Sequence, residues 1–332
     1  MAELERASAL GARPLFTIEP GYPALLAHLD VPPPLVYAKG DIGRLQRPAI
    51  AIVGSRLASA AGLAFARRVA VDLAAAGYVT VSGLARGIDA AVHDATLETG
   101  TIAVLAGGID FIYPPENARL HEEIGRRGCL LTEMPPGFEP RARDFPRRNR
   151  LISGLSRGVV VVEAAERSGT LVTARMAAEQ GREVFAVPGH PLDPRAAGTN
   201  NLIRNGATLV MSADDILAEL APIVGAGHGA HEAPDRYATG VTSVPEDRAV
   251  DLTPPPLPPA APTDGDRNEI LRLLGPSPIT TDDLARAAKI DARQLRAVLM
   301  ELDLAGRIER HGLGLVSLRL TSPATLQDAH RT

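Results

Sequence analysis

The segment Ala49-Ile50-Ala51-Ile52-Val53-Gly54-Ser55 is a short apolar run that ends in two small residues. After it, stretches with helical spacing, such as Ala64, Val69 and Leu73, alternate with further apolar runs of strand length. These runs cover residues 78–82, 101–107, 129–133, 159–163, 183–187 and 208–212. The alternation predicts an α/β fold, with a mainly parallel sheet and helices on both of its faces.

Small residues recur at the carboxyl ends of these predicted strands, which is where open parallel sheets bind ligands. Glycine lets backbone N–H groups approach an anion closely, and the N-terminus of a following helix adds a favourable dipole. A tight turn with an exposed arginine is the simpler interpretation of any one of these loops. Together they predict a phosphate-sized pocket with these candidate residues: Gly54, Ser55, Arg56, Gly83, Arg86, Gly107, Gly108, Ser168, Gly169 and Thr170.

An arginine cluster precedes the fifth predicted strand. Between residues 141 and 157 the chain carries six arginines and a single acidic residue, Asp144. Guanidinium groups at this density suit a phosphate-binding wall, and Phe145 at its edge suits stacking on a base. The alternative is a solvated basic helix end whose Phe145 belongs to the core. The position before a central strand favours binding, with Arg143 and Asn149 as further candidate contacts.

Three arginines of this cluster, Arg147, Arg148 and Arg150, cannot all share one face of a helix. We expect one of them to bind a phosphate and another to hold a carboxylate at a strand end. Glu133 and Glu163 are the candidate carboxylates. A pair of acids at strand ends is also suited to acid–base chemistry, which is the competing interpretation of these two residues.

Other polar residues near the predicted loops have simple structural interpretations. Asp89 is expected to cap a helix, and His93 to pack within it. Asn200 either contacts bases or caps a turn. Ser168 is not expected to be a nucleophile, because the sequence offers no matching His/Asp set. The sequence has neither a G-x-G-x-x-G nor a G-x-x-x-x-G-K-[ST] motif, and its eight histidines are dispersed. We therefore expect no catalytic residue, no metal site and no cofactor.

The composition is that of a globular protein whose positive charge is local. Over 332 residues the net charge is −4, so a nucleic-acid partner is argued from the placement of arginines and not from the total. No apolar run has membrane-spanning length, and the N-terminus lacks the apolar core of a signal peptide. The single cysteine, Cys129, fits a reducing compartment. These features predict a cytoplasmic protein without a membrane contact.

Composition also divides the chain into segments. Residues 47–220 carry the predicted sheet, and residues 1–46 are expected to form an extended arm lying on it. Residues 221–265 contain nine prolines and no apolar periodicity, which is typical of a flexible linker. Residues 266–320 form a separate unit, and residues 321–332 a tail.

The unit after the linker has the pattern of a winged helix-turn-helix. Helical stretches at 267–274, 281–288 and 292–305 precede a predicted hairpin, Arg307–Leu318, with glycines at its turn. The expected recognition helix carries both basic and acidic residues: Arg293, Arg296, Asp291 and Glu301. With this mixture of charges, the unit could contact either duplex DNA or another protein.

In their order and spacing, the motifs between residues 20 and 220 resemble the DNA-processing protein A family (DprA, also called Smf). The matching stretches are Tyr22-Pro23, Tyr37–Gly40, Ile52–Arg56, Ser82–Asp89, Gly107–Asp110, Tyr113-Pro114, Asn117, Phe145–Ile152, Ser168–Ala174, Val187–Gly189, Gly198–Asn200 and Gly206-Ala207. The resemblance implies an extended Rossmann-like domain that binds single-stranded DNA without sequence preference. It also implies a homodimer that protects incoming DNA and helps load a RecA-type recombinase in natural transformation.

The resemblance also implies roles for individual residues. Arg56 and either Arg148 or Arg150 would be phosphate ligands, Phe145 would stack on or wedge a base, and the glycine-rich turns would line the pocket. Many members carry a helical SAM-like domain before this region, whereas this sequence shows only a short arm. Some members have a lysine where Ala142 stands here.

Two other functions remain open at this point. A transcription regulator led by the winged helix, with the sheet domain as ligand sensor, is one. A nucleoside monophosphate-processing enzyme is the other, although the Pro-Gly-Gly-x-Gly-Thr motif of such enzymes is absent. Gly107-Gly108 and Ser168-Gly169-Thr170 match that motif only in pieces.

Overall fold

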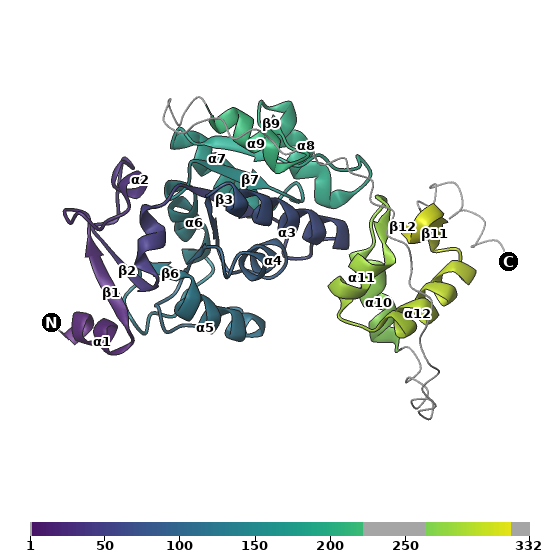
Figure 1. The fold of residues 1–332 in the computed structure, drawn as a ribbon, viewed down its shortest axis with the longest axis horizontal. Coiled ribbons are helices and arrows are strands. Elements are labelled where there is room, and N and C mark those ends of the chain that lie inside the picture. Colours follow the sequence, from purple (N-terminus) through teal and green to yellow (C-terminus); the bar gives the residue numbers. More distant parts are fainter. Residues whose placement is uncertain (1, 222–262, 320–332) are drawn as a thin grey trace, which may run out of the picture.

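The computed structural model describes residues 2–221 and 263–319 (Figure 1). The first of these ranges forms an α/β domain, and the second forms a smaller unit beside it. Most of the predicted linker and the whole predicted tail, residues 321–332, lie outside the described residues. Within the described ranges, no helix combines the length and the apolar character that crossing a membrane requires.

The larger domain is built on a nine-stranded sheet with the order β1-β2-β6-β5-β4-β3-β7-β8-β9. Seven neighbouring strands, from β6 to β9, are parallel, and each corresponds to one of the apolar runs predicted as strands. They are β3 (Ala49–Val53), β4 (Val79–Ser82), β5 (Thr101–Val104), β6 (Cys129–Thr132), β7 (Gly158–Val161), β8 (Glu183–Ala186) and β9 (Thr208–Leu209). The prediction of a mainly parallel α/β sheet is confirmed.

The N-terminal segment is not the extended arm expected from its sequence. It forms α1 (Ala2–Ala9), β1 (Ala12–Phe16), α2 (Ala24–Ala27), β2 (Leu35–Gly40) and the 3-10 helix η1 (Ile42–Gln46). Strand β2 pairs antiparallel with β6, and β1 pairs antiparallel with β2. Val36 and Tyr37 are both buried, so β2 contributes side chains to both faces of the sheet. Because β1 and β2 pair into the sheet and β2 is buried, the N-terminal segment forms one edge of the sheet.

Helices cover both faces of the sheet because the buried strands are apolar on both faces. Along β3, Ala51 and Val53 pack on one side with residues of α6 and α7, while Ile50 and Ile52 pack on the other side with α3, α4 and α9. The helices are α3 (Ala60–Ala75), α4 (Ile88–Ala95), α5 (Ala118–Arg127), α6 (Asp144–Gly154), α7 (Thr170–Glu179), α8 (Ala197–Arg204) and α9 (Ala213–Leu220), with the 3-10 helices η2 (Pro115–Asn117) and η3 (Pro194–Ala196).

The C-terminal unit has the predicted winged-helix architecture. Its helices are α10 (Asp264–Leu273), α11 (Thr281–Ala288) and α12 (Ala292–Leu304). Strands β10 (Ile279–Thr280), β11 (Ile308–His311) and β12 (Leu315–Leu318) form a sheet of order β10-β12-β11, and the short 3-10 helix η4 (Gly312–Gly314) joins the last two. Helix α10 begins two residues before the predicted boundary at 266, because Thr263 and Asp266 form a capping box.

The winged helix packs against the larger domain. Ala60, at the start of α3, belongs to the same buried cluster as the apolar core of the winged helix. Figure 1 shows α11 beside the N-terminal end of α3. The Arg195 guanidinium donates to the backbone carbonyls of Arg272 and Leu274, at 3.2 and 3.1 Å, where α10 ends. Asp193 holds Arg195 in this position through an ion pair of 2.9 Å.

Candidate functional site

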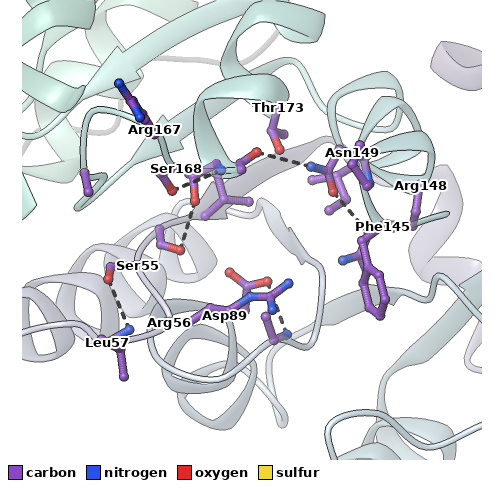
Figure 2. Close-up of a pocket in the computed structure, with 18 of the residues that line it drawn as sticks. Ser55, Arg56, Leu57, Asp89, Phe145, Arg148, Asn149, Arg167, Ser168 and Thr173 are labelled. Carbon is purple, nitrogen blue, oxygen red and sulfur yellow. Dashed lines mark hydrogen bonds between the residues drawn. The ribbon is translucent and has the colours of Figure 1, made fainter. Parts of the chain in front are cut away.

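A pocket of about 630 Å³ lies where β3 and β7 end (Figure 2). Most of its lining residues come from three segments: the loop after β3, the first turns of α6, and the loop that leads into α7. This is the carboxyl edge of the parallel strands, where the sequence predicts ligand binding. Nine of the predicted residues line it: Gly54, Ser55, Arg56, Phe145, Arg148, Asn149, Ser168, Gly169 and Thr170.

Local hydrogen bonds hold the two loops of the pocket in place. The Thr170 hydroxyl donates to the Gly54 carbonyl at 3.1 Å, which ties the start of α7 to the end of β3. The Ser168 hydroxyl accepts the Thr170 N–H at 3.2 Å, although the N-cap position of α7 is Gly169. Gly54 is required here, because a Cβ atom would lie 2.6 Å from Ile88. Contacts within the chain therefore fix the shape of these loops.

An accessible arginine and two aromatic rings meet at one side of the pocket. The guanidinium carbon of Arg56 lies 5.8 Å from the centre of the Phe145 ring. The rings of Phe145 and Tyr113 lie 5.1 Å apart, with an angle of 56° between their planes. Tyr113 is 43% exposed, so an incoming planar group has an apolar surface to stack on. Cation–π attraction orients Arg56 beside that surface.

Arg148 lines the same pocket, but its guanidinium is committed to the backbone. The side chain is 7% exposed. It donates to the Gly83 carbonyl at 2.8 Å and, through a shorter contact, to the Val104 carbonyl. Burial lowers the pKa of Arg148 to about 10, while the nearby Asp89 carboxylate opposes that shift. Arg56 is thus the arginine of this pair that a ligand can reach.

Asp89 organises the loop after β4 and does not cap a helix as the sequence suggests. The N-cap position of α4 is Gly87. The Asp89 carboxylate accepts the N–H groups of Gly83 and Ala85, at 3.1 and 3.3 Å. Burial raises the pKa of Asp89, and the Arg148 charge acts in the opposite direction. Gly83 therefore links the two buried charges, donating to Asp89 and accepting from Arg148.

The carboxylates at the strand ends hold structural partners. Arg150 donates to Glu133 at 2.6 Å and Arg147 at 3.4 Å, which confirms that an arginine of the cluster orients an acid. Glu163 instead accepts the backbone N–H and the hydroxyl of Ser59, at 2.9 and 2.5 Å. Burial raises the pKa of Glu163. Neither glutamate lines the pocket.

Two predicted glycines lie next to the pocket rather than in it. Gly83 and Gly107 line a small adjoining hollow, whose other walls include Tyr113, Phe145 and Arg148. The Gly108 carbonyl accepts the Phe111 N–H at 3.0 Å in a turn, and the Gly108 N–H donates to the Phe138 carbonyl of another loop at 2.9 Å. The hollow and the larger pocket share Tyr113, Phe145 and Arg148 as lining residues.

Three other predicted contacts lie outside the pocket. Arg86 is exposed and pairs with Glu116 at 3.3 Å. Arg143 is exposed in the turn that precedes α6. The Asn200 amide exchanges hydrogen bonds with the backbone of Gly189, at 3.2 and 3.0 Å, so it stabilises a turn.

Two pocket residues that could contact a nucleotide were not among the predicted ones. Tyr113, in the loop after β5, packs against Phe145 with its ring tilted, and Arg167 lies in the loop before α7. The Tyr113-Pro114 dipeptide was visible as a family motif, but nothing in the sequence connects it to Phe145. Within residues 2–221 and 263–319, neither Arg56 nor Arg167 forms an ion pair, so both charges are available to an anion. The same residues contain no group of three or more metal-ligating side chains.

His93 has the packing role that its sequence context predicts. It is fully buried, and its Nδ1 atom lies 2.7 Å from the Thr101 hydroxyl. Burial lowers the pKa of His93 to about 3, and the charge of Arg148 adds to this effect. The ring is therefore neutral at ordinary pH and does not line the pocket.

The fold and the pocket together define an α/β protein with an arginine-containing pocket bordered by aromatic rings, extended by a winged helix. The chain belongs to the DNA recombination-mediator protein A family, whose model matches residues 13–221. The model of the DprA winged helix domain matches residues 254–312. The resemblance noted from the sequence motifs is thus confirmed.

Curated relatives agree with this assignment. The chain is 46% identical over 202 residues to DNA processing protein DprA of Bacillus subtilis, covering 60% of this chain and 68% of the relative. It is 41% identical over 300 residues to Protein Smf of Escherichia coli, covering 90% and 75%. The match to Protein Smf of Synechocystis, at 43% identity over 211 residues, spans 62% of this chain and only 53% of that relative.

Two solved structures share the fold at substantial identity. DNA processing protein A from Streptococcus pneumoniae has a TM-score of 0.62 and 42% identity, covering 66% of this chain and 77% of that one. DNA processing protein A from Helicobacter pylori has a TM-score of 0.59 and 30% identity, covering 64% and 96%. The latter structure is described by its single-stranded DNA binding mode.

Proposed function

We propose that this protein binds single-stranded DNA without sequence preference and performs no chemistry on it. In the cell it would act in the cytoplasm as a homodimer, protecting incoming DNA and helping to load a RecA-type recombinase during natural transformation and recombination. The observation that carries the proposal is the convergence of Arg56 with the Phe145–Tyr113 pair at the rim of one pocket.

The pocket provides contacts for both the phosphate and the base of a nucleotide. Arg56 and Arg167 provide positive charge for phosphates, and the aromatic pair provides a stacking surface for a base. Stacking tolerates any base, because every base has a π-face. The Asn149 amide is turned toward the Gly169 carbonyl at 3.5 Å, so it contributes to the wall rather than to base reading. Sequence-independent binding follows from this combination.

The same geometry argues against catalysis. Among the described residues that line the pocket, Asp89 is the one carboxylate, and it is buried against the amides of Gly83 and Ala85. Glu133 and Glu163, the acids that a nucleotide-processing enzyme would use, are engaged elsewhere. A general acid or base must reach the reacting atoms. A binding function therefore accounts better for the pocket.

The comparisons support the biological part of the proposal. The matched family is described as a recombination mediator, and the Helicobacter pylori relative is described as binding single-stranded DNA. Recombinase loading, the homodimer and the cytoplasmic location are our extensions from that family to this chain.

Fluorescence anisotropy with labelled single-stranded and duplex oligonucleotides over a salt series tests the proposal. Phe145→Ala should weaken single-strand binding by about 1–3 kcal/mol, because it removes a stacking surface. Arg56→Ala should flatten the log–log salt dependence by about 0.7, the contribution of one phosphate contact. Arg175→Ala is the matched control, because Arg175 is an exposed arginine of α7 that pairs with Glu179 outside the pocket.

The possible outcomes separate the candidate functions. A preference for single strands that falls in the two pocket variants and not in the control supports the proposal. Tight, sequence-selective binding of duplex DNA would favour the transcription regulator. Release of bases from nucleoside monophosphates, abolished by Glu133→Gln or Glu163→Gln, would favour the enzyme.

A further inference from the structure

A second cleft, of about 610 Å³, separates the sheet domain from the winged helix. The sheet domain contributes residues of α3, α4, η2 and α5 to its walls. The winged helix contributes residues of α10 together with Ala287 and Lys289, at the end of α11. Helices α3 and α11, one from each domain, are in contact (Figure 1).

Positive charge exceeds negative charge in this cleft. Its acidic residues each have an arginine partner, in the pairs Arg86–Glu116 at 3.3 Å, Arg119–Asp94 at 4.0 Å and Arg272–Glu269 at 2.5 Å. Three cations remain that form no ion pair within the described part of the chain. They are Arg56, Arg67 and Lys289.

Arg67 lies in an environment where a bound anion would stabilise its charge. It lies on α3 and is half-buried. Burial lowers the pKa of Arg67, the Asp94 charge opposes this, and the like charge of Arg286 adds to the lowering. A bound phosphate would relieve both unfavourable effects, because it would place a negative charge beside a poorly solvated guanidinium.

The cleft and the pocket at the strand ends share a wall. Arg56 and Leu57 line both of them. Arg56 therefore stands between the aromatic pair on one side and Arg67 and Lys289 on the other. A chain of phosphates that leaves the first site over Arg56 enters the second directly.

From this continuity we infer that the interdomain cleft binds the phosphodiester backbone of the same DNA strand that occupies the pocket at the strand ends. The inference rests on the proposed function and extends it to the winged helix. No aromatic side chain lies among the described residues that line the cleft, so it holds phosphates and does not stack bases. Binding here is again independent of sequence.

This arrangement gives the winged helix an unusual part in DNA binding. Arg293 and Arg296, on the expected recognition helix α12, do not line the cleft. The contact comes instead from Lys289, the left-handed residue that ends α11, and from the pair Arg272–Glu269 on α10. The side of the winged helix that faces the sheet domain thus meets the single strand, and α12 is left to other partners.

Oligothymidines of two lengths test the inference on the full-length chain. One of about 6 nucleotides can fill the pocket alone, whereas one of about 20 nucleotides can also cross the cleft. The double variant Arg67→Gln with Lys289→Asn removes two cations, and asparagine tolerates the left-handed backbone at Lys289. The matched control is Arg68→Gln, because Arg68 is the next residue of α3, pairs with Asp72 and lies outside the cleft.

We expect the double variant to bind the short oligonucleotide like the wild type and the long one more weakly. Two lost phosphate contacts should reduce the log–log salt slope for the long strand by about 1.4. If the salt curves meet near 1 M, this amounts to about 25-fold weaker binding near 0.1 M salt. The control should behave like the wild type with both lengths.

Each contrary result has a distinct meaning. Unchanged binding of the long strand by the double variant would overturn the inference and leave the pocket intact. An equal loss in the Arg68 control would also overturn it, because the effect would then be one of total charge. Failure of the wild type to bind either length would reject the proposed function itself. Thermal unfolding of all three proteins shows whether the variants remain folded.

Discussion

Replacement of Arg148 by methionine should lower the free energy of unfolding by about 3–5 kcal/mol. The guanidinium donates to two backbone carbonyls, at Gly83 and Val104, and hydrogen bonds from a charged donor contribute about 1.5–3 kcal/mol each. Its loss also leaves the buried Asp89 carboxylate without its countercharge. Burial of the guanidinium, which lowers the pKa of Arg148 to about 10, offsets part of this stabilisation.

The loss should depend on pH in a defined direction. Burial already raises the pKa of Asp89, and without Arg148 it should rise further. An acid whose pKa is higher in the folded than in the unfolded chain destabilises the fold above its unfolded pKa, and this penalty disappears as the pH falls. The stability difference between Arg148→Met and the wild type should therefore be smaller near pH 5 than near pH 8.

Urea unfolding followed by far-UV circular dichroism measures these quantities, since the chain has no tryptophan. Asp89→Asn completes a double-mutant cycle with Arg148→Met, and the two effects should fall short of additivity by about 0.5–3 kcal/mol. A variant within about 0.5 kcal/mol of the wild type, with a reduced salt slope for DNA binding instead, would refute the structural role and make Arg148 a phosphate ligand.

Three further predictions concern buried groups. Gly83→Ala should destabilise the fold by about 1–3 kcal/mol in urea unfolding, because a Cβ atom would lie 2.7 Å from the Arg148 guanidinium. Burial raises the pKa of Glu163, so that residue stabilises the fold less as the pH rises. Glu163→Gln should therefore gain stability relative to the wild type between about pH 4 and pH 7. A stability difference that stays constant over this range would contradict the prediction. Burial also raises the pKa of Cys129 to about 12, so mass spectrometry should detect alkylation by iodoacetamide only after unfolding.

The parallel part of the sheet was predictable because each strand is a continuous apolar run with a helical pattern after it. Ala49–Val53 and Gly158–Val161 carry that signal within a few residues. Strand β2 carries no such signal, since its pairing with β6 joins residues about ninety positions apart, as in Gly40 with Cys129. Pairing at that distance depends on contacts formed across the whole sheet, so the local periodicity of the sequence does not predict it.

The sequence predicted which loops form the candidate site, but it did not predict the separate roles of the arginines. Arg56, Arg148 and Arg150 are equivalent by residue type, yet the first is accessible, the second is buried and the third holds Glu133. The partners of Arg148 are backbone carbonyls, which any sequence would supply. The role of Tyr113 depends in the same way on a contact across thirty-two positions of the chain.

The two edges of the nine-stranded sheet also bear on how the molecule avoids uncontrolled growth. An unpaired edge strand invites a neighbouring chain to add a further strand, which is a route to aggregation. At one edge, β1 contains Pro14, which has no N–H to offer an added strand. At the other edge, β9 is only two residues long, Thr208–Leu209, and offers too short a template. A broad sheet can thus stay finite in a crowded cell without a barrel to close it.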